Sequence, residues 1–167
     1  YFLDVGSSNY GQGSYTVKAK ALAADVRGDR YTTSSVAING QTTSSIDLRG
    51  DRDWFKVSLV AGRRYQFDVT GTGSGTSRLS DANLYLRSWS GGYLTYDNNS
   101  GNGYDPRITY TATSSGTYFL DVGSSNYGQG SYTVKAKALA ADVRGDRYTT
   151  SGVAINGQTT SSIDLRG

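Results

Sequence analysis

Aspartate is the residue type on which any chemistry of this chain depends. All 14 acidic residues are Asp, and the sequence contains no His, Cys, Met or Glu. This composition excludes thiol nucleophiles, Ser-His-Asp triads, disulfides and Cys/His zinc sites. Carboxylates remain suited to acid-base catalysis in pairs and to the binding of hard cations. No Asp lies in a recognisable catalytic motif, so we predict that the protein is not an enzyme.

One acidic loop, residues 97–105, carries oxygen-bearing side chains in close succession. Asp97, Asn99 and Asp105 are its candidate calcium ligands. The loop lacks the closing Glu of an EF-hand, and no helical pattern flanks it. Asx-turns, in which Asn and Asp side chains bind their own backbone, account for such a loop without a metal. Both interpretations remain open from the sequence.

Large aromatic side chains gather around this loop and the hairpin before it. Trp89, Tyr93, Tyr96 and Tyr104 are candidates for contact with a ligand or partner, because aromatic rings near polar loops can stack on sugars or on other chains. The alternative is that they form cross-strand pairs that stabilise a sheet.

Strands must position these side chains, because the composition favours β-structure and turns. The chain has 14 Tyr, 22 Gly and one Pro, and apolar residues alternate with polar ones. Alternation predicts strands at 55–59 and 65–69, joined as a β-hairpin by a turn at 61–64. Further strands are predicted at 84–86, 93–96, 108–110, 118–122 and 132–134. Seven strands with frequent turns indicate an all-β fold, a β-sandwich.

A long internal repeat determines how these strands are organised. Residues 1–50 reappear as residues 118–167, an offset of 117 residues, with Gly152 in place of Ser35 as the single change. Such near-identity indicates a tandem array. Recent duplication, maintained uniformity or engineering would each account for it. Because the chain begins in mid-strand at Tyr1, we expect it to be a window from a longer polypeptide.

The repeat divides the chain into four predicted parts. Residues 1–20 are the last two strands of a preceding repeat, and residues 21–50 are a connector with a hairpin-like excursion at Asn39-Gly40. Residues 51–137 are a complete β-sandwich, and residues 138–167 are a connector toward the next repeat. Residues 1–20 and 118–137 would compete for the same place in one sandwich. We therefore expect either a long covalent array or a filament that exchanges strands.

Several spaced motifs resemble one known family. They are residues 50–57 (GDRDWFKV), 105–112 (DPRITYTA), 115–122 (SGTYFLDV) and 130–134 (GSYTV). Together they are similar to the bacterial pre-peptidase C-terminal domain over about residues 51–136. The resemblance implies a jelly-roll-like antiparallel β-sandwich, non-catalytic, from a secreted bacterial protein. It also implies tandem use in very large, calcium-dependent exported proteins.

The same resemblance implies a calcium site where the connector meets the first strand of the sandwich. The matching positions here are Asp25 and Asp29 in the connector, with Asp51 and Asp53 at the start of the strand. Calcium takes six to eight oxygen ligands, so backbone oxygens would complete the shell. The alternative is that neighbouring arginines pair with these aspartates as surface salt bridges.

The basic residues do not indicate a nucleic-acid partner. The net charge is +3, but the 17 Lys and Arg residues are spread along the chain, whereas nucleic-acid binders concentrate them in a patch or stripe. No run approaches the roughly 20 apolar residues of a membrane helix, so no membrane insertion is expected.

These observations predict a non-enzymatic structural repeat of a bacterial fibre, stalk or adhesin, located outside the cell or on its surface. Its partners would be neighbouring copies of the same repeat, and calcium would stiffen each connector. The alternative is an accessory module that tethers a secreted hydrolase to extracellular polysaccharide or protein.

Overall fold

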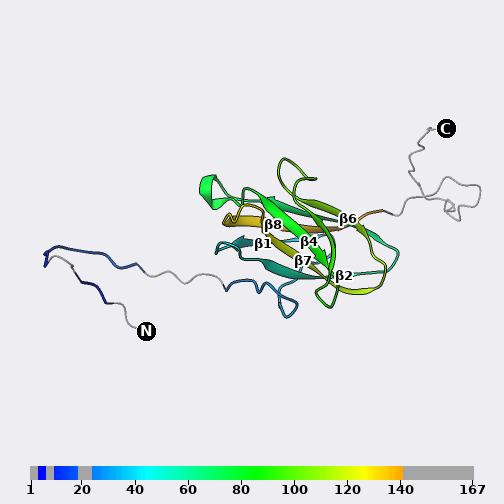
Figure 1. Ribbon diagram of the computed structural model, residues 1–167, viewed down its shortest axis with the longest axis horizontal. Helices are drawn as coiled ribbons and strands as arrows, with labels where there is room; N and C mark the ends of the chain where they lie inside the picture. The colour runs from blue at the N-terminus through cyan, green and yellow to red at the C-terminus, as the bar shows by residue number, and fades with distance from the viewer. Residues whose placement is uncertain (1–3, 7–9, 19–23, 141–167) are drawn as a thin grey trace, which may run out of the picture.

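The computed structural model describes residues 4–6, 10–18 and 24–140, and eight of its strands build a β-sandwich (Figure 1). The elements are β1 (Gly40–Ile46), β2 (Asp53–Leu59), β3 (Arg64–Gly71), η1 (Gly75–Ser77, a 3-10 turn), β4 (Ala82–Arg87), β5 (Tyr93–Asp97), β6 (Arg107–Thr111), β7 (Gly116–Ser124) and β8 (Gly130–Ala138). The predicted all-β sandwich is confirmed.

Two four-stranded antiparallel sheets pack face to face, with orders β1-β8-β3-β6 and β2-β7-β4-β5. Alternation along each strand turns one set of side chains inward. Phe55 of β2, Phe67 of β3 and Leu84 of β4 are fully buried between the sheets. These inward positions are the apolar members of the alternating pattern in the sequence.

The segment predicted as a connector forms part of the sandwich. β1 pairs with β8 from Gly40↔Ala136 to Ile46↔Gly130, and the side chains of Val36 and Ile46 lie in the core. Residues 34–36 also run beside β2, since the backbone N–H of Val36 donates to the carbonyl of Lys56 at 2.9 Å. The sequence did not reveal this because the predicted connector shows little alternation of apolar and polar residues.

The predicted hairpin of residues 55–59 and 65–69 is wrong. β2 and β3 follow each other in the chain, but β2 pairs with β7 while β3 pairs with β6 and β8. The turn between them therefore crosses from one sheet to the other. Alternation identifies a strand's buried face but not its neighbour, so both arrangements fit the same pattern. The strands predicted at residues 84–86 and 93–96 are present as β4 and β5, and these two strands pair with each other.

The sandwich has two poles with different loops. The N-terminal pole carries residues 47–52, 72–81, 98–106 and 125–129, next to the point at which the chain arrives. The C-terminal pole carries residues 37–39, 60–63, 88–92, 112–115 and the end of β8. Because β8 has nine residues, its two ends are roughly 26 Å apart. The chain thus arrives at one pole and leaves at the other (Figure 1).

β7 and β8 occupy the places for which residues 1–20 would compete. The described residues near the start, 4–6 and 10–18, form no strand and are exposed. The second predicted connector, residues 138–167, lies outside the described residues from position 141 onward. None of the described residues forms a helix with the length and hydrophobicity that crossing a bilayer would require.

Candidate cation site

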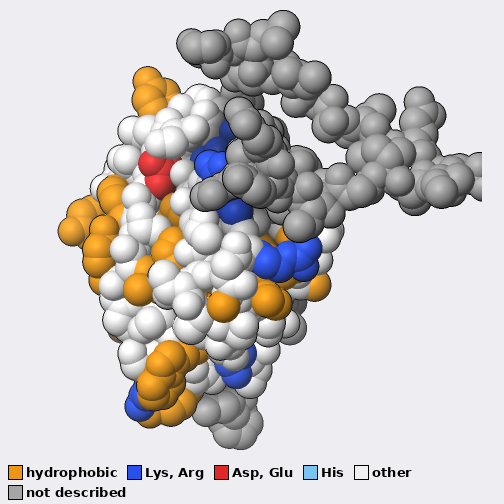
Figure 2. All heavy atoms as spheres, turned by 90° about the vertical axis from the view of Figure 1, so that its right-hand side faces the viewer, with side chains coloured by type: hydrophobic (Ala, Val, Ile, Leu, Met, Phe, Trp, Pro, Cys, Tyr) orange, Lys and Arg blue, Asp and Glu red, His pale blue; other side chains and the backbone are white. Residues whose placement is uncertain are grey.

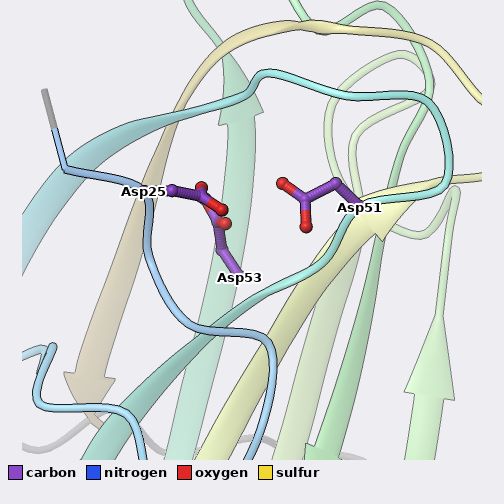
Figure 3. Close-up of side chains that lie close together, drawn as sticks. All are labelled: Asp25, Asp51 and Asp53. Atoms are coloured by element: carbon purple, nitrogen blue, oxygen red, sulfur yellow. The ribbon is translucent and has the colours of Figure 1, made fainter. Parts of the chain in front are cut away.

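Three carboxylates converge at the N-terminal pole, where the chain meets the sandwich. Asp25 lies on the arriving segment, Asp51 in the loop after β1, and Asp53 at the first position of β2 (Figure 3). One oxygen from each carboxylate lies within 4.8 Å of the others. This separation allows a single cation to contact all three.

Strand alternation explains why Asp53 points inward while its neighbour Arg52 does not. Asp53 shares the inner face of β2 with Phe55 and Val57, and its side chain is completely buried. Arg52 points to the outer face, where its Nε–H donates to Asp121 at 2.5 Å. The nearest base in the sequence is therefore turned away from the three carboxylates.

Burial and mutual repulsion disfavour the charged form of these acids. The pKa of Asp53 is raised to about 6, first by burial and then by the negative charges of Asp51 and Asp25. Burial also raises the pKa of Asp51, with further contributions from Asp25 and Asp47. A carboxylate cluster without a cation is thus electrostatically unfavourable at neutral pH.

Two carboxylate oxygens at this site are buried and have no hydrogen-bond partner among the described residues. The backbone N–H of Arg52 donates to Asp51 Oδ1 at 2.7 Å, and the Tyr132 hydroxyl donates to Asp53 Oδ2. Asp51 Oδ2 and Asp53 Oδ1 accept no hydrogen bond. Buried polar atoms are rarely left unpaired. The orphaned oxygens and the all-oxygen donor set fit a hard divalent cation such as calcium.

Asp29, the fourth predicted ligand, does not join the cluster. Its Oδ1 accepts hydrogen bonds from Arg27 Nε at 2.6 Å and from the backbone N–H of Tyr31 at 2.8 Å. The hydrogen bond from Arg27 lowers the pKa of Asp29. The structure therefore brings together three of the four aspartates and places the fourth in a surface ion pair.

The acidic loop of residues 97–105 is held by the protein's own donors. Asp97 accepts from the backbone N–H groups of Ser100 and Arg107 at 2.9 and 2.8 Å. Asp105 is buried, and its Oδ1 accepts from the backbone N–H of Gly71 at 3.3 Å. Within the described residues, this loop contributes to no group of three convergent acids. Side-chain hydrogen bonds to the backbone account for its shape, as in an Asx-turn.

The four candidate aromatic side chains do not share one surface. Tyr93 and Tyr96 flank Tyr85 on the outer face of β4 and β5, with ring centres 6.2 and 4.6 Å from that of Tyr85. Trp89 is 73% exposed in the turn at the C-terminal pole, whereas Tyr104 is exposed in a loop at the N-terminal pole. The cross-strand pairing considered from the sequence is thus present for Tyr96, which faces Tyr85.

Sequence reasoning missed a charged network on the outer face of β2, β7 and β4. Asp121 is fully buried and accepts the Nε–H of both Arg52 and Arg87 at 2.5 Å. The Arg52 guanidinium lies 4.6 Å from the ring centre of Tyr85, and that of Arg87 lies 4.8 Å from the ring centre of Trp54. Alternation places these side chains on the outer face but gives no sign of their pairing.

One family model matches the central part of the chain. Residues 51–124 match the model of the bacterial pre-peptidase C-terminal domain. The matched span runs from Asp51 through β7, so it contains Asp51 and Asp53 but not Asp25, β1 or β8. Pre-peptidase C-terminal domains are non-catalytic accessory modules of secreted bacterial proteins.

Solved structures with a similar fold include one pre-peptidase C-terminal domain. That domain, from the collagenase of Bacillus anthracis, is 21% identical with a TM-score of 0.48, covering 62% of this chain and 93% of that chain. The periplasmic inhibitor of g-type lysozyme from Aeromonas hydrophila is 15% identical with a TM-score of 0.46, covering 64% of this chain and 96% of that chain. A search of curated proteins finds no match.

Proposed function

We propose that this chain is a calcium-binding structural unit of a tandem array outside a bacterial cell, and that calcium fastens the arriving chain to each sandwich. One observation supports this most directly. The carboxylates of Asp25, Asp51 and Asp53 converge from separate segments with two buried oxygens unpaired. A cation bound there would join the arriving segment to β2 and offset the repulsion among the acids.

The spacing of the repeat supports the array. Residues 25–141 make up one period of 117 residues, and the described sandwich is built within residues 25–138. Residues 142–167 repeat residues 25–50, the segment that packs against β2 and β8 in the described unit. A copy of residues 51–141 after position 167 would therefore complete a second unit. Arrival and departure at opposite poles would extend such a chain into a fibre or stalk.

Thermal unfolding of the 167-residue chain tests the calcium site. Calcium at about 100 times its dissociation constant should stabilise the fold by about 2.7 kcal/mol, which raises Tm by roughly 10 °C relative to the protein in chelator. Asp51→Asn and Asp53→Asn should each abolish most of this shift. Asp29→Asn is the matched control and should retain it, because Asp29 is bound to Arg27. Equal Tm values with calcium and with chelator would exclude the site.

Exposed tyrosines favour a second function, that of an accessory module binding extracellular polysaccharide or protein. Tyr93 and Tyr96 lie beside Tyr85 on the outer face of β4 and β5, and aromatic faces of this kind can stack on sugar rings or on a partner. Retention on insoluble polysaccharide or collagen, lost in Tyr93→Ser and Tyr96→Ser, would support this function. Absence of retention would leave the structural role.

A filament that exchanges strands between separate subunits is the other route to a fibre. In the described unit, β7 and β8 come from residues 116–138, so a covalent array needs no donated strand. The intact mass of the native polypeptide separates the two. A mass many times that of one unit indicates a covalent array, whereas 17.9 kDa indicates exchange between subunits.

A further inference from the structure

The C-terminal pole has a hollow that is open to solvent and is lined by both aromatic and polar side chains. Trp89, Leu94, Tyr110 and Tyr118 line it together with the turn at residues 113–117, and its volume is about 510 Å³. Trp89 is among the most exposed large side chains of the described residues. Figure 2 looks onto this pole and shows hydrophobic and basic side chains distributed over it, with an acidic side chain also in view. Exposed Trp and Tyr side chains are enriched at protein interfaces, so this hollow is suited to contact with a partner.

The two poles carry opposite charge. The loops of the C-terminal pole contain no acid, while Arg63 and the adjoining Arg64 are both exposed there. The N-terminal pole is rich in acids, namely Asp25, Asp47, Asp51, Asp53, Asp81, Asp97 and Asp105. Of its arginines, Arg52 and Arg78 are paired with Asp121 and Asp105, while Arg49 in the loop after β1 is exposed, so the acids of this pole outnumber its bases. Charge of opposite sign on two surfaces favours their association and sets its orientation.

The repeat leaves little chain between consecutive units. β8 ends at Ala138, and Asp142 is the copy of Asp25, which lies in the carboxylate cluster of its own unit. Four residue steps span at most about 14 Å. The end of β8 in one unit must therefore lie close to the N-terminal pole of the next, and so short a tether gives the two poles a high effective concentration.

We infer that the C-terminal pole of each unit docks on the N-terminal pole of the next copy along the chain. This inference rests on the tandem array proposed above and names the surfaces that meet in it. The hollow beside Trp89 is at the centre of the contact, and Arg63 and Arg64 face the aspartates of the following unit. The N-terminal pole also offers exposed apolar side chains to this contact, Leu48, Tyr104 and Tyr127.

A chain with two complete units tests the docking directly. It consists of the 167 residues extended at Gly167 by a copy of residues 51–141, with Trp89→Phe in the second copy. Only the first Trp89 then faces a neighbour, while Trp54 is buried in each unit. Docking should lower the acrylamide quenching of Trp89 at least about twofold relative to the 167-residue chain, because the core of an interface is packed like a protein interior.

The matched control places the probe at the free end. In the same two-unit chain, Trp89→Phe in the first copy leaves Trp89 only in the second, where no unit follows. Its quenching should equal that of the 167-residue chain. Equal quenching of Trp89 at both positions would overturn the inference.

Charge reversal tests the orientation of the contact. Arg63→Glu with Arg64→Glu in the first copy should restore the quenching of its Trp89, because acids would then face acids. Lys56→Glu, on the outer face of β2 away from both poles, makes a charge change of the same sign and should leave the quenching low. Identical quenching in the two variants would show that the arginines do not face the next unit.

The two proposals fail in different measurements. A native polypeptide of single-unit mass would contradict the proposed covalent array. An unchanged Tm on chelation would contradict the proposed calcium site. Trp89 that stays exposed in the two-unit chain would end the docking while leaving both of those intact.

Discussion

At the scale of one residue, Asp53 shows how alternation along a strand can bury a carboxylate whose charged form is unfavourable. It lies on the inner face of β2 with Phe55 and Val57, so its carboxylate is buried at the mouth of the sandwich. The Tyr132 hydroxyl donates a hydrogen bond to one of its oxygens, and the other has no hydrogen-bond partner in the part of the chain that the structure describes. Burial and the charges of Asp51 and Asp25 raise the pKa to about 6. The cation proposed for this site would offset the cost of the charged form.

The raised pKa of Asp53 predicts how stability depends on pH. In chelator, the Asp53 carboxyl group binds its proton more tightly in the folded state than in the unfolded state. The stabilisation is therefore present below the unfolded pKa of 3.8 and is lost as pH rises through the folded value of about 6. Because the pKa rises from 3.8 to about 6, the loss is about 3 kcal/mol. Calcium requires the ionised form, so its effect on Tm should shrink as pH falls below 6.

Asp53→Asn isolates this contribution in denaturant titrations between pH 4 and 8. In chelator, the difference in stability between wild type and variant should grow with pH in favour of the variant. A difference that does not change over this range would contradict the assignment of the raised pKa to Asp53.

At the scale of elements, the segment before β2 is part of the fold. β1 pairs along its whole length with β8, and Ile46 at its end packs in the core with 1% of its surface exposed. The segment contributes both a strand and, through Asp25, a candidate cation ligand. The sandwich is therefore a unit that starts near residue 25.

Two substitutions near the end of β1 test this assignment. Ile46→Ala should destabilise the protein by about 2–4 kcal/mol, because it leaves a cavity in the core. Leu48→Ala, only two residues away, should change stability by less than about 0.5 kcal/mol, since Leu48 is 69% exposed. Chemical denaturation measures both. Equal small effects would indicate that residues 40–46 form a connector outside the fold.

On the outer face of the β2-β7-β4-β5 sheet, ion pairs stabilise the fold in addition to packing. Asp121 of β7 accepts hydrogen bonds from Arg52, just before β2, and from Arg87 of β4. Asp121→Ala should destabilise the fold by about 3 kcal/mol, because it leaves two half-buried arginines without their partner. Asp29→Ala removes an exposed ion pair, which solvent screens, and should therefore have a much smaller effect. Thermal or chemical unfolding compares the two variants, and equal losses would contradict a special role for Asp121.

At the scale of the whole molecule, the strand directions decide how successive units can be joined. The chain arrives at the N-terminal pole, and β8 carries it to the opposite pole. The linker of the proposed array spans at most about 14 Å, so each unit must begin near the C-terminal pole of the one before it, and the docking inferred above would place the two end to end. Successive units are therefore expected to extend in one direction.

Small-angle X-ray scattering of the two-unit chain should detect this extension. Its maximum dimension should exceed that of the 167-residue chain by at least about 26 Å, the length of one β8 strand. A two-unit chain with the same maximum dimension would mean that the units lie side by side, and would contradict the extended array.

Much of the fold and of the site could be predicted from local pattern. Alternation located the strands that became β2 to β8, because burying one face of a strand requires an apolar residue at every second position. The resemblance to a known family indicated Asp25, Asp51 and Asp53, which the structure brings together. The repeat could be identified by comparing residues 1–50 with residues 118–167.

Only the tertiary structure decided which segments lie side by side. It separated β2 and β3 into different sheets, added β1 to the sandwich, and bound Asp29 to Arg27 instead of to the cluster. The physical reason is that alternation records which side of a strand faces the core, and this is a local property. Strand partners, and the distances between carboxylates, depend on contacts between residues far apart in the chain, and these form only when the two sheets pack together.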